Sequence, residues 1–124
     1  MSAHSSVAPD SIRWFRARVV GLIIDGRTEL ALRLLAEHYG VSEPTLRVGT
    51  VKRHRKVLAC YVEKEKRIYL SNSNFISNPF VVLHEFYHHL RASEFGKKRQ
   101  VENRADLFAA HFIREFRNVS STLK

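Results

Sequence analysis

Apolar residues recur at helical spacing along the first third of the chain. The first apolar stripe consists of Ile12, Phe15, Val19, Leu22 and Ile23. It follows Asp10 and Ser11, either of which can cap a helix, and Asp25-Gly26 ends it. A second amphipathic stripe consists of Leu30, Ala31, Leu34, Leu35 and His38, and Gly40 closes it. Two N-terminal helices are therefore predicted.

Three short runs with β-forming composition come next, at Leu46 to Arg53, Lys56 to Glu63 and Arg67 to Ser71. The short polar links His54-Arg55 and Lys64-Glu65 predict hairpins between successive runs. Neither link carries the Asn-Gly signal of a tight turn, so the pattern does not define the strand register. We expect a small twisted sheet of three strands or more.

Two further helices are predicted after the strands. Asn78 is placed to cap the first of them, with Pro79 at its first helical position and Gly96 ending it near Phe95. The last helix is expected from about Lys98 to Arg117. Its apolar stripe consists of Val101, Ala105, Phe108, Ala109, Phe112, Ile113 and Phe116. The order of helices, strands and helices predicts an α+β fold.

The first of these C-terminal helices contains the pattern His84-Glu85-x-x-His88 within an apolar run. Residues four apart lie on the same helix face, so His84 and His88 can bind one zinc ion together. Glu85 is turned by about 100° and can reach a water on that zinc. The alternative is a core helix with two satisfied histidines, but a buried charge and two imidazoles are unfavourable unless something pairs them.

A third zinc ligand is available on the last predicted helix. Glu102 and Asp106 are four residues apart and share a helix face. Glu102 can complete a His/His/Glu site, and Asp106 can accept the free ring N–H of a ligand histidine, which we expect to be His84. The alternative is a solvated helix face on which both acids partner Lys98 or Arg99.

The combination of these residues resembles a known group of enzymes. His84-Glu85-x-x-His88 followed by Glu102-x-x-x-Asp106 resembles the gluzincin arrangement of zinc peptidases. The run Glu-x-x-Ala-Asp-x-Phe-Ala is similar to that of ImmA/IrrE-type metallopeptidases and of the archaeal minigluzincins. The resemblance covers about residues 67–116. It implies a zincin-like fold with an active-site helix and a C-terminal ligand helix, His84, His88 and Glu102 as metal ligands, Glu85 as general base and Asp106 as the support of a ligand.

One departure from the ImmA/IrrE-type pattern qualifies this resemblance, and the flanking residues exclude a different clan. ImmA/IrrE-type chains usually carry Asn where this chain has Asp106, which is closer to the general gluzincin pattern. The metzincin extension requires Gly and His where this chain has Arg91 and Glu94, so that clan is excluded.

The expected reaction is peptide-bond hydrolysis by metal-activated water. Zinc makes the water more acidic, and Glu85 accepts its proton and passes it to the leaving amine. Candidate donors to the developing oxyanion are Tyr87, His89, His54 and His111. We expect the peptide or protein substrate to add as a strand to an exposed sheet edge, although the sequence does not identify that edge.

Size and composition indicate one soluble domain. The chain has 124 residues, of which 44% are hydrophobic, enough for one modest core. Residues 1–9 are expected to form a flexible tail without signal-peptide character, and residues 10–124 a single minimal zincin-like domain. No run is long enough to span a bilayer, so no membrane partner is expected. The single cysteine, Cys60, indicates a reducing, cytoplasmic location, and its apolar surroundings favour core packing over a regulatory role.

The charge balance is strongly basic. Lys and Arg total 21 against 12 acids, a formal net charge of +9, and the cations concentrate at residues 47–56 and 91–104. We interpret these basic residues as a surface that keeps the protein soluble. The alternative is that they attract nucleic acid or an acidic protein substrate. No nucleic-acid-binding motif accompanies the basic residues.

The sequence thus favours a zinc endopeptidase, active or latent, over two alternatives. One is a catalytically silent zincin-like protein that binds a regulator or nucleic acid. The other is a zinc enzyme that hydrolyses a non-peptide bond. The intact Glu85 argues against the silent protein, which has no need of a general base.

Overall fold

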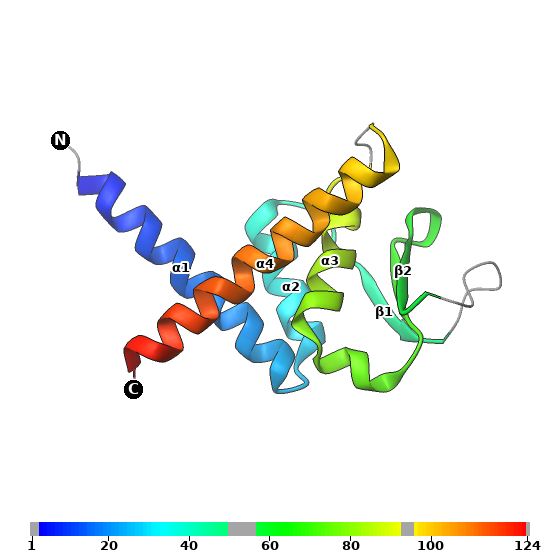
Figure 1. The fold of residues 1–124 in the computed structure, drawn as a ribbon, viewed down its shortest axis with the longest axis horizontal. Coiled ribbons are helices and arrows are strands. Elements are labelled where there is room, and N and C mark those ends of the chain that lie inside the picture. Colours follow the sequence, from blue (N-terminus) through cyan, green and yellow to red (C-terminus); the bar gives the residue numbers. More distant parts are fainter. Residues whose placement is uncertain (1–2, 50–56, 93–95, 124) are drawn as a thin grey trace.

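The protein has an α+β fold, as predicted. The structure is a computed structural model that describes residues 3–49, 57–92 and 96–123. Its helices are α1 (Ala3–Ile24), α2 (Thr28–Tyr39), α3 (Pro79–Leu90) and α4 (Lys98–Leu123). Its strands are β1 (Thr45–Val48), β2 (Ala59–Val62) and β3 (Arg67–Leu70). Figure 1 shows the sheet on one side of α3, while α1 and α4 cross and extend to the other side, where both chain ends lie. None of the described helices is long and apolar enough to cross a membrane.

The first helix begins earlier than predicted. α1 starts at Ala3 and is helical through residues 3–9, where the sequence predicts a flexible tail and a cap at Asp10 or Ser11. The predicted start is therefore wrong. Extension of an existing helix adds one hydrogen bond for each residue ordered, so the helix continues past residues that could have capped it. The predicted end is confirmed, because α1 stops at Ile24 and Gly26 turns the chain with a φ of 83°.

The second helix ends as predicted at Gly40. This glycine has a left-handed φ of 69°, and the N–H groups of Gly40 and Val41 donate to the carbonyls of Glu37 and Ala36. Such a cap satisfies carbonyls that the helix leaves without partners, and glycine reaches this conformation without steric penalty.

The sheet has the order β1-β3-β2. β2 and β3 pair antiparallel through a short turn at Glu63–Glu65, so the second predicted hairpin is confirmed. The first predicted hairpin is wrong, because β3 lies between β1 and β2 and pairs parallel with β1. The predicted link His54-Arg55 lies outside the described residues. β3 takes the central place because Ile68 and Leu70 are both fully buried against the helices. Among the described strands, β2 therefore lies at an edge of the sheet.

Helix α3 starts as predicted and ends earlier. The Asn78 side chain accepts the N–H of Val81 at 3.1 Å, and Pro79 is the first helical residue. α3 ends at Leu90 because the apolar run ends there and Arg91, which is exposed, leaves the helical conformation. The predicted end near Phe95 is wrong, and Phe95 itself lies outside the described residues.

One hydrophobic core joins the helices to the sheet. Fully buried members of this core include Ile23, Leu35, Ile68, Leu70, Val82, Leu83, Phe86 and Phe112. α4 starts at Lys98, as predicted, and runs past the predicted end at Arg117 to Leu123, because the buried Val119 extends its apolar stripe. Through this stripe, α4 packs against both α1 and α3. The packing against α3 places the first turns of α4 beside the face of α3 that carries the histidines.

Candidate metal centre

The side chains that the sequence singles out come from two adjacent helices. His84 and His88 lie one turn apart on α3, and Glu102 and Asp106 lie one turn apart on α4. His84 contacts Asp106, and His88 contacts Glu102, so the two helices run in opposite directions at this point. The pairing of one face with the other brings all four polar groups together.

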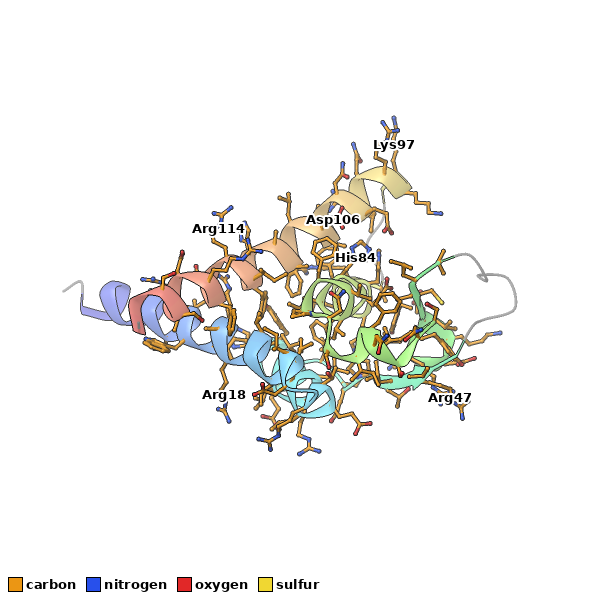
Figure 2. The ribbon with its side chains drawn as sticks, turned by 60° about the horizontal axis from the view of Figure 1, so that its bottom comes forward. Arg18, Arg47, His84, Lys97, Asp106 and Arg114 are labelled. Atoms are coloured by element: carbon orange, nitrogen blue, oxygen red, sulfur yellow. The ribbon has the colours of Figure 1, made fainter. Side chains whose placement is uncertain are left out.

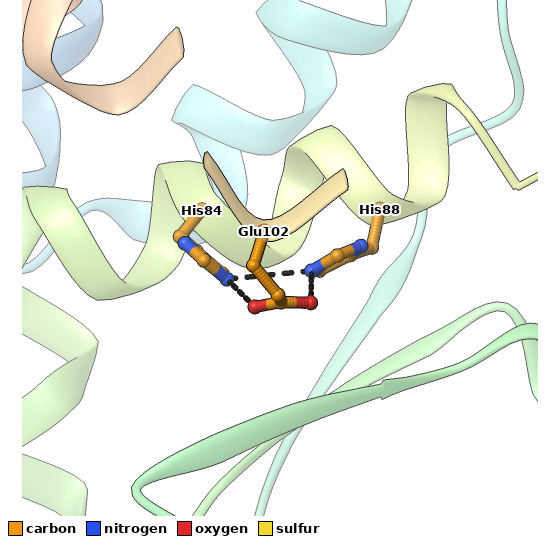
Figure 3. A group of neighbouring side chains, drawn as sticks. All are labelled: His84, His88 and Glu102. Carbon is orange, nitrogen blue, oxygen red and sulfur yellow. Dashed lines mark hydrogen bonds and ion pairs between the residues drawn. The ribbon is translucent and has the colours of Figure 1, made fainter. Parts of the chain in front are cut away.

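Three of these side chains converge on one point, as Figure 3 shows. The two carboxylate oxygens of Glu102 lie 2.8 Å from His84 Nε2 and 3.0 Å from His88 Nε2. The two Nε2 atoms are 3.3 Å apart. Two nitrogens that each lie about 2.05 Å from a tetrahedral zinc ion are separated by roughly 3.3 Å, so the spacing of the donors fits one such ion. The structure therefore contains a His-His-Glu cluster within metal-binding distance.

Asp106 fixes the orientation of the first histidine. Its Oδ1 lies 2.8 Å from His84 Nδ1, the contact that the sequence predicts. A carboxylate can only accept, so the Nδ1–H of His84 donates to Asp106, and Nε2, which faces Glu102 and His88, is the atom at which a metal would take the place of a proton. Within residues 3–49, 57–92 and 96–123, the ion pairs of Glu102 and Asp106 are with His84 and His88, not with Lys98 or Arg99, the partners named in the solvated-face alternative.

The second histidine is kept neutral by its surroundings. Burial lowers the pKa of His88, the nearby Glu102 carboxylate opposes this effect, and His84 adds to the lowering. A neutral imidazole has a free lone pair, which is the form that binds metal ions. The environment of His88 therefore favours ligation at neutral pH.

Glu85 is buried beside the cluster but does not belong to it. Only 8% of its surface is exposed. Burial raises the pKa of Glu85 from 4.5 to about 7, with an opposing effect from His84 and a further increase from the Glu102 charge. Such a carboxyl group can take up and release a proton near neutral pH, which is the property required of a general acid–base residue.

A pocket of about 260 Å³ opens next to these groups. Its polar wall includes His84, Glu85, Glu102 and Asp106. Its apolar wall consists of Leu58, Ala59, Phe80 and Val81. The sequence interpretation named no substrate-binding residue and missed this apolar wall. Phe80 could have been found, because it precedes His84 by four residues and so shares its helix face. Leu58 and Ala59 join the pocket only through the tertiary packing of β2.

The candidate oxyanion donors do not reach this pocket in the part of the chain that the structure describes. Tyr87 is buried and its ring packs against Phe108. His111 is exposed on α4, outside the pocket and the cluster. His54 lies outside the described residues. Tyr87 and His111 are thus not placed to stabilise an oxyanion at this pocket.

The remaining candidate, His89, connects α3 with β2 and the segment after α2. Its Nε2–H donates to the Ser42 carbonyl at 2.7 Å, which leaves Nδ1 to accept the Tyr61 hydroxyl at 2.7 Å. Tyr61 belongs to the edge strand, so this pair of bonds holds that strand beside the site. Cys60 on the same strand is half-buried, and burial, reinforced by the Glu85 charge, raises the pKa of its thiol.

No protein-family profile, curated protein or solved structure matches this chain. The resemblance to gluzincins therefore stays a prediction that rests on the residues themselves.

Proposed function

We propose that this protein is a zinc-dependent endopeptidase with a zincin-like fold. The observation that carries the proposal is the convergence of His84, His88 and Glu102 within reach of one ion, beside a buried Glu85 and an open pocket. Two imidazoles and one carboxylate leave a coordination position for water or substrate, as catalytic zinc sites do.

In this proposal, His84, His88 and Glu102 hold the metal and Asp106 holds His84. The separation of the donor atoms and the neutral state favoured at His88 support this assignment. A bound zinc ion would supply Lewis acidity, which polarises a carbonyl and makes water more acidic. The remaining chemistry belongs to side chains of this chain.

Glu85 is the proposed general base and then the general acid. It removes a proton from the attacking water and later delivers it to the nitrogen of the leaving amine. Its low exposure excludes competing bulk water, and its pKa of about 7 matches both transfers. As the water oxygen bonds to the carbonyl carbon and the C–N bond breaks, the proton passes from water to the leaving amine, and Glu85 is regenerated.

The edge strand β2 is the proposed docking site for the substrate backbone. β2 pairs only with β3 among the described strands, and Leu58 and Ala59 at its start line the pocket. An extended peptide can add to such an edge through backbone hydrogen bonds. Leu58 and Phe80 are both exposed at the pocket and would receive an apolar side chain next to the reacting carbonyl.

The decisive experiment combines metal analysis with peptide cleavage. Purified wild type should contain one zinc per chain and cleave a denatured protein, and a chelator should abolish cleavage until zinc is restored. Glu85→Gln should keep zinc and lose at least about a hundred-fold in activity, the scale expected for a general base.

Alanine variants of the ligands provide the second arm of this experiment. His84→Ala, His88→Ala and Glu102→Ala should lose zinc, whereas His111→Ala, an exposed histidine outside the cluster, should keep it. Wild-type zinc content in all three ligand variants would rule out the assigned site. Full activity of Glu85→Gln would rule out the mechanism.

A further inference from the structure

We propose that exposed cations at the start of α4 select substrates with an acidic side chain on the N-terminal side of the cleaved bond. The cations are Lys97, Lys98 and Arg99, called here the basic tip. The inference deepens the proposed peptidase function and rests on it, because it assigns a substrate class to the same cleft. Three observations support it: the position of the basic tip on α4, its positive charge and the chain direction of the edge strand β2.

The basic tip lies one helical turn from the metal ligand on α4. Lys98 and Arg99 precede Glu102 by four and three residues, which puts them on the face that carries Glu102 and Asp106. Four residues of helix advance by about 6 Å. Figure 2 shows Lys97 at the beginning of α4, while Asp106 and His84 lie close together farther along the helix.

No other part of the described fold accounts for these charges. All three side chains are exposed, and no ion pair in residues 3–49, 57–92 and 96–123 involves them. The first turn of α4 contains no acidic residue. Cations at a helix N-terminus oppose the helix dipole, so the stability of α4 does not explain them either. The charges are available for a partner of opposite sign.

The direction of β2 tells which side of a substrate the basic tip would meet. The start of β2, at Leu58 and Ala59, shares a pocket with His84, whereas Tyr61 farther along contacts His89. β2 therefore runs in the same direction as α3. A peptide that adds antiparallel, the more stable pairing, places its N-terminal part at the His88 end of the cleft.

The basic tip lies at that same end. His88 contacts Glu102, the ligand nearer to the start of α4, whereas His84 also contacts Asp106, one turn deeper in the helix. An extended peptide advances by about 3.3 Å per residue, so a distance of about 6 Å corresponds to roughly two residues. An acidic side chain two or three positions before the cleaved bond would then lie beside Lys98 and Arg99.

The test uses three peptides of equal length with one common cleavage site, confirmed by mass spectrometry. One carries an Asp-Glu pair two and three positions before the bond, one carries the same pair after the bond, and one carries Asn-Gln in its place. Wild type should cleave the first peptide with a kcat/KM about five-fold or more above the neutral one at low salt, and 0.5 M NaCl should reduce this preference.

Two double variants separate the basic tip from the overall charge. Lys98→Glu with Arg99→Glu should abolish or reverse the preference while neutral-peptide cleavage and zinc content stay unchanged. Arg18→Glu with Arg114→Glu is the matched control, since both residues are exposed and lie away from His84 in Figure 2. Each pair lowers the formal net charge from +9 to +5, because each reversal removes two charges. Acidic residues in the first turn of α4 suit its dipole, so the tip variant should fold.

Several outcomes would overturn the proposal. These are equal kcat/KM on all three peptides, a preference for acids after the bond, or loss of selectivity in the control variant. Preferential binding of single-stranded DNA at the tip without peptide selectivity would also overturn it.

Failure of the proposed peptidase function would be distinguishable from failure of this inference. If wild type cleaves no peptide, binding of fluorescein-labelled acidic and neutral peptides to Glu85→Gln still tests the tip. Tighter binding of the acidic peptide that disappears with the two tip substitutions supports the inference, and equal binding contradicts it.

Discussion

Asp106 and Glu102 lie one turn apart on α4, but they contact different nitrogens of the same imidazole. Glu102 lies 2.8 Å from His84 Nε2, and Asp106 lies 2.8 Å from His84 Nδ1. Each carboxylate therefore has its own proposed task, one at the metal and one in holding the ring. The tasks are separable by substitution, because only Glu102 also reaches His88.

Asp106→Ala should weaken zinc affinity by about 10- to 100-fold without loss of the fold, the range typical for the partner of a metal-binding histidine. Asp106→Asn should be milder, because an amide oxygen still accepts the His84 Nδ1–H. A chelator competition titration measures both variants against wild type. If the three affinities are equal, Asp106 has no part in the site, and its contact with His84 is a surface ion pair of less than about 1 kcal/mol.

The burial of Glu85 predicts a pH-dependent stability of the metal-free protein. Because the folded pKa is raised from 4.5 to about 7, the folded state keeps a proton that the unfolded state has lost between these values. The stability of the folded state should thus fall as pH rises through this window, by about 3 kcal/mol in total at 1.36 kcal/mol per pKa unit. Urea unfolding in the presence of a chelator, at pH 4.5 and pH 8, measures this change.

Glu85→Gln should remove this part of the pH dependence. The free energy of unfolding of the variant minus that of wild type should therefore be larger at pH 8 than at pH 4.5. Glu37→Gln, at an exposed site on α2, controls for the general effect of replacing a glutamate. A Glu85→Gln difference that is the same at both pH values would contradict the buried-carboxyl account.

At the scale of elements, a side-chain hydrogen bond joins β2 to α3 in addition to the packing between the two elements. The Tyr61 hydroxyl donates to His89, which is itself fixed by the Ser42 carbonyl. β2 has only β3 as a neighbouring strand in the described sheet, so its distance from α3 is not fixed by a second strand. The hydroxyl therefore contributes to the alignment of the proposed substrate-binding edge.

Tyr61→Phe should raise KM for an extended peptide by a few-fold and leave zinc affinity unchanged. The lost hydrogen bond should lower the free energy of unfolding by about 1 kcal/mol. Tyr69→Phe on β3 is the matched control, because its hydroxyl contacts Glu65 and Arg67 rather than α3. Steady-state kinetics and chelator competition measure the two effects. A fall in zinc affinity by the same factor as the rise in KM would place Tyr61 at the metal instead of at the edge strand.

At the scale of the whole molecule, the long helices α1 and α4 provide the scaffold on which the site is assembled. α4 packs against α1 where the two helices cross, and against α3 (Figure 1). Ala105 and Ala109 are fully buried on the face that packs inward, and their small side chains allow close approach of the helices. The proposed ligand Glu102 is therefore held by packing that extends beyond the site.

Local patterns in the sequence determined those parts of the protein that depend on neighbouring residues. The pairing of His84 with His88 follows from the helical repeat, the start of α3 from Asn78 and Pro79, and the end of α2 from Gly40. The second hairpin was also predictable, because its strands are joined by a short polar link. In each case the interacting residues are only a few positions apart in the sequence. Their relative positions are therefore limited to a few backbone conformations, which the local sequence can specify.

Only the tertiary structure decided features that depend on which surfaces pack together. β3 lies between β1 and β2 because its buried face suits the centre of the sheet, and this choice makes β2 the edge that carries Leu58 to the pocket. The closeness of Glu102 to His84 joins residues 18 positions apart on two helices, and no local periodicity sets the angle between helices. That angle follows from the fit of buried side chains across the whole core.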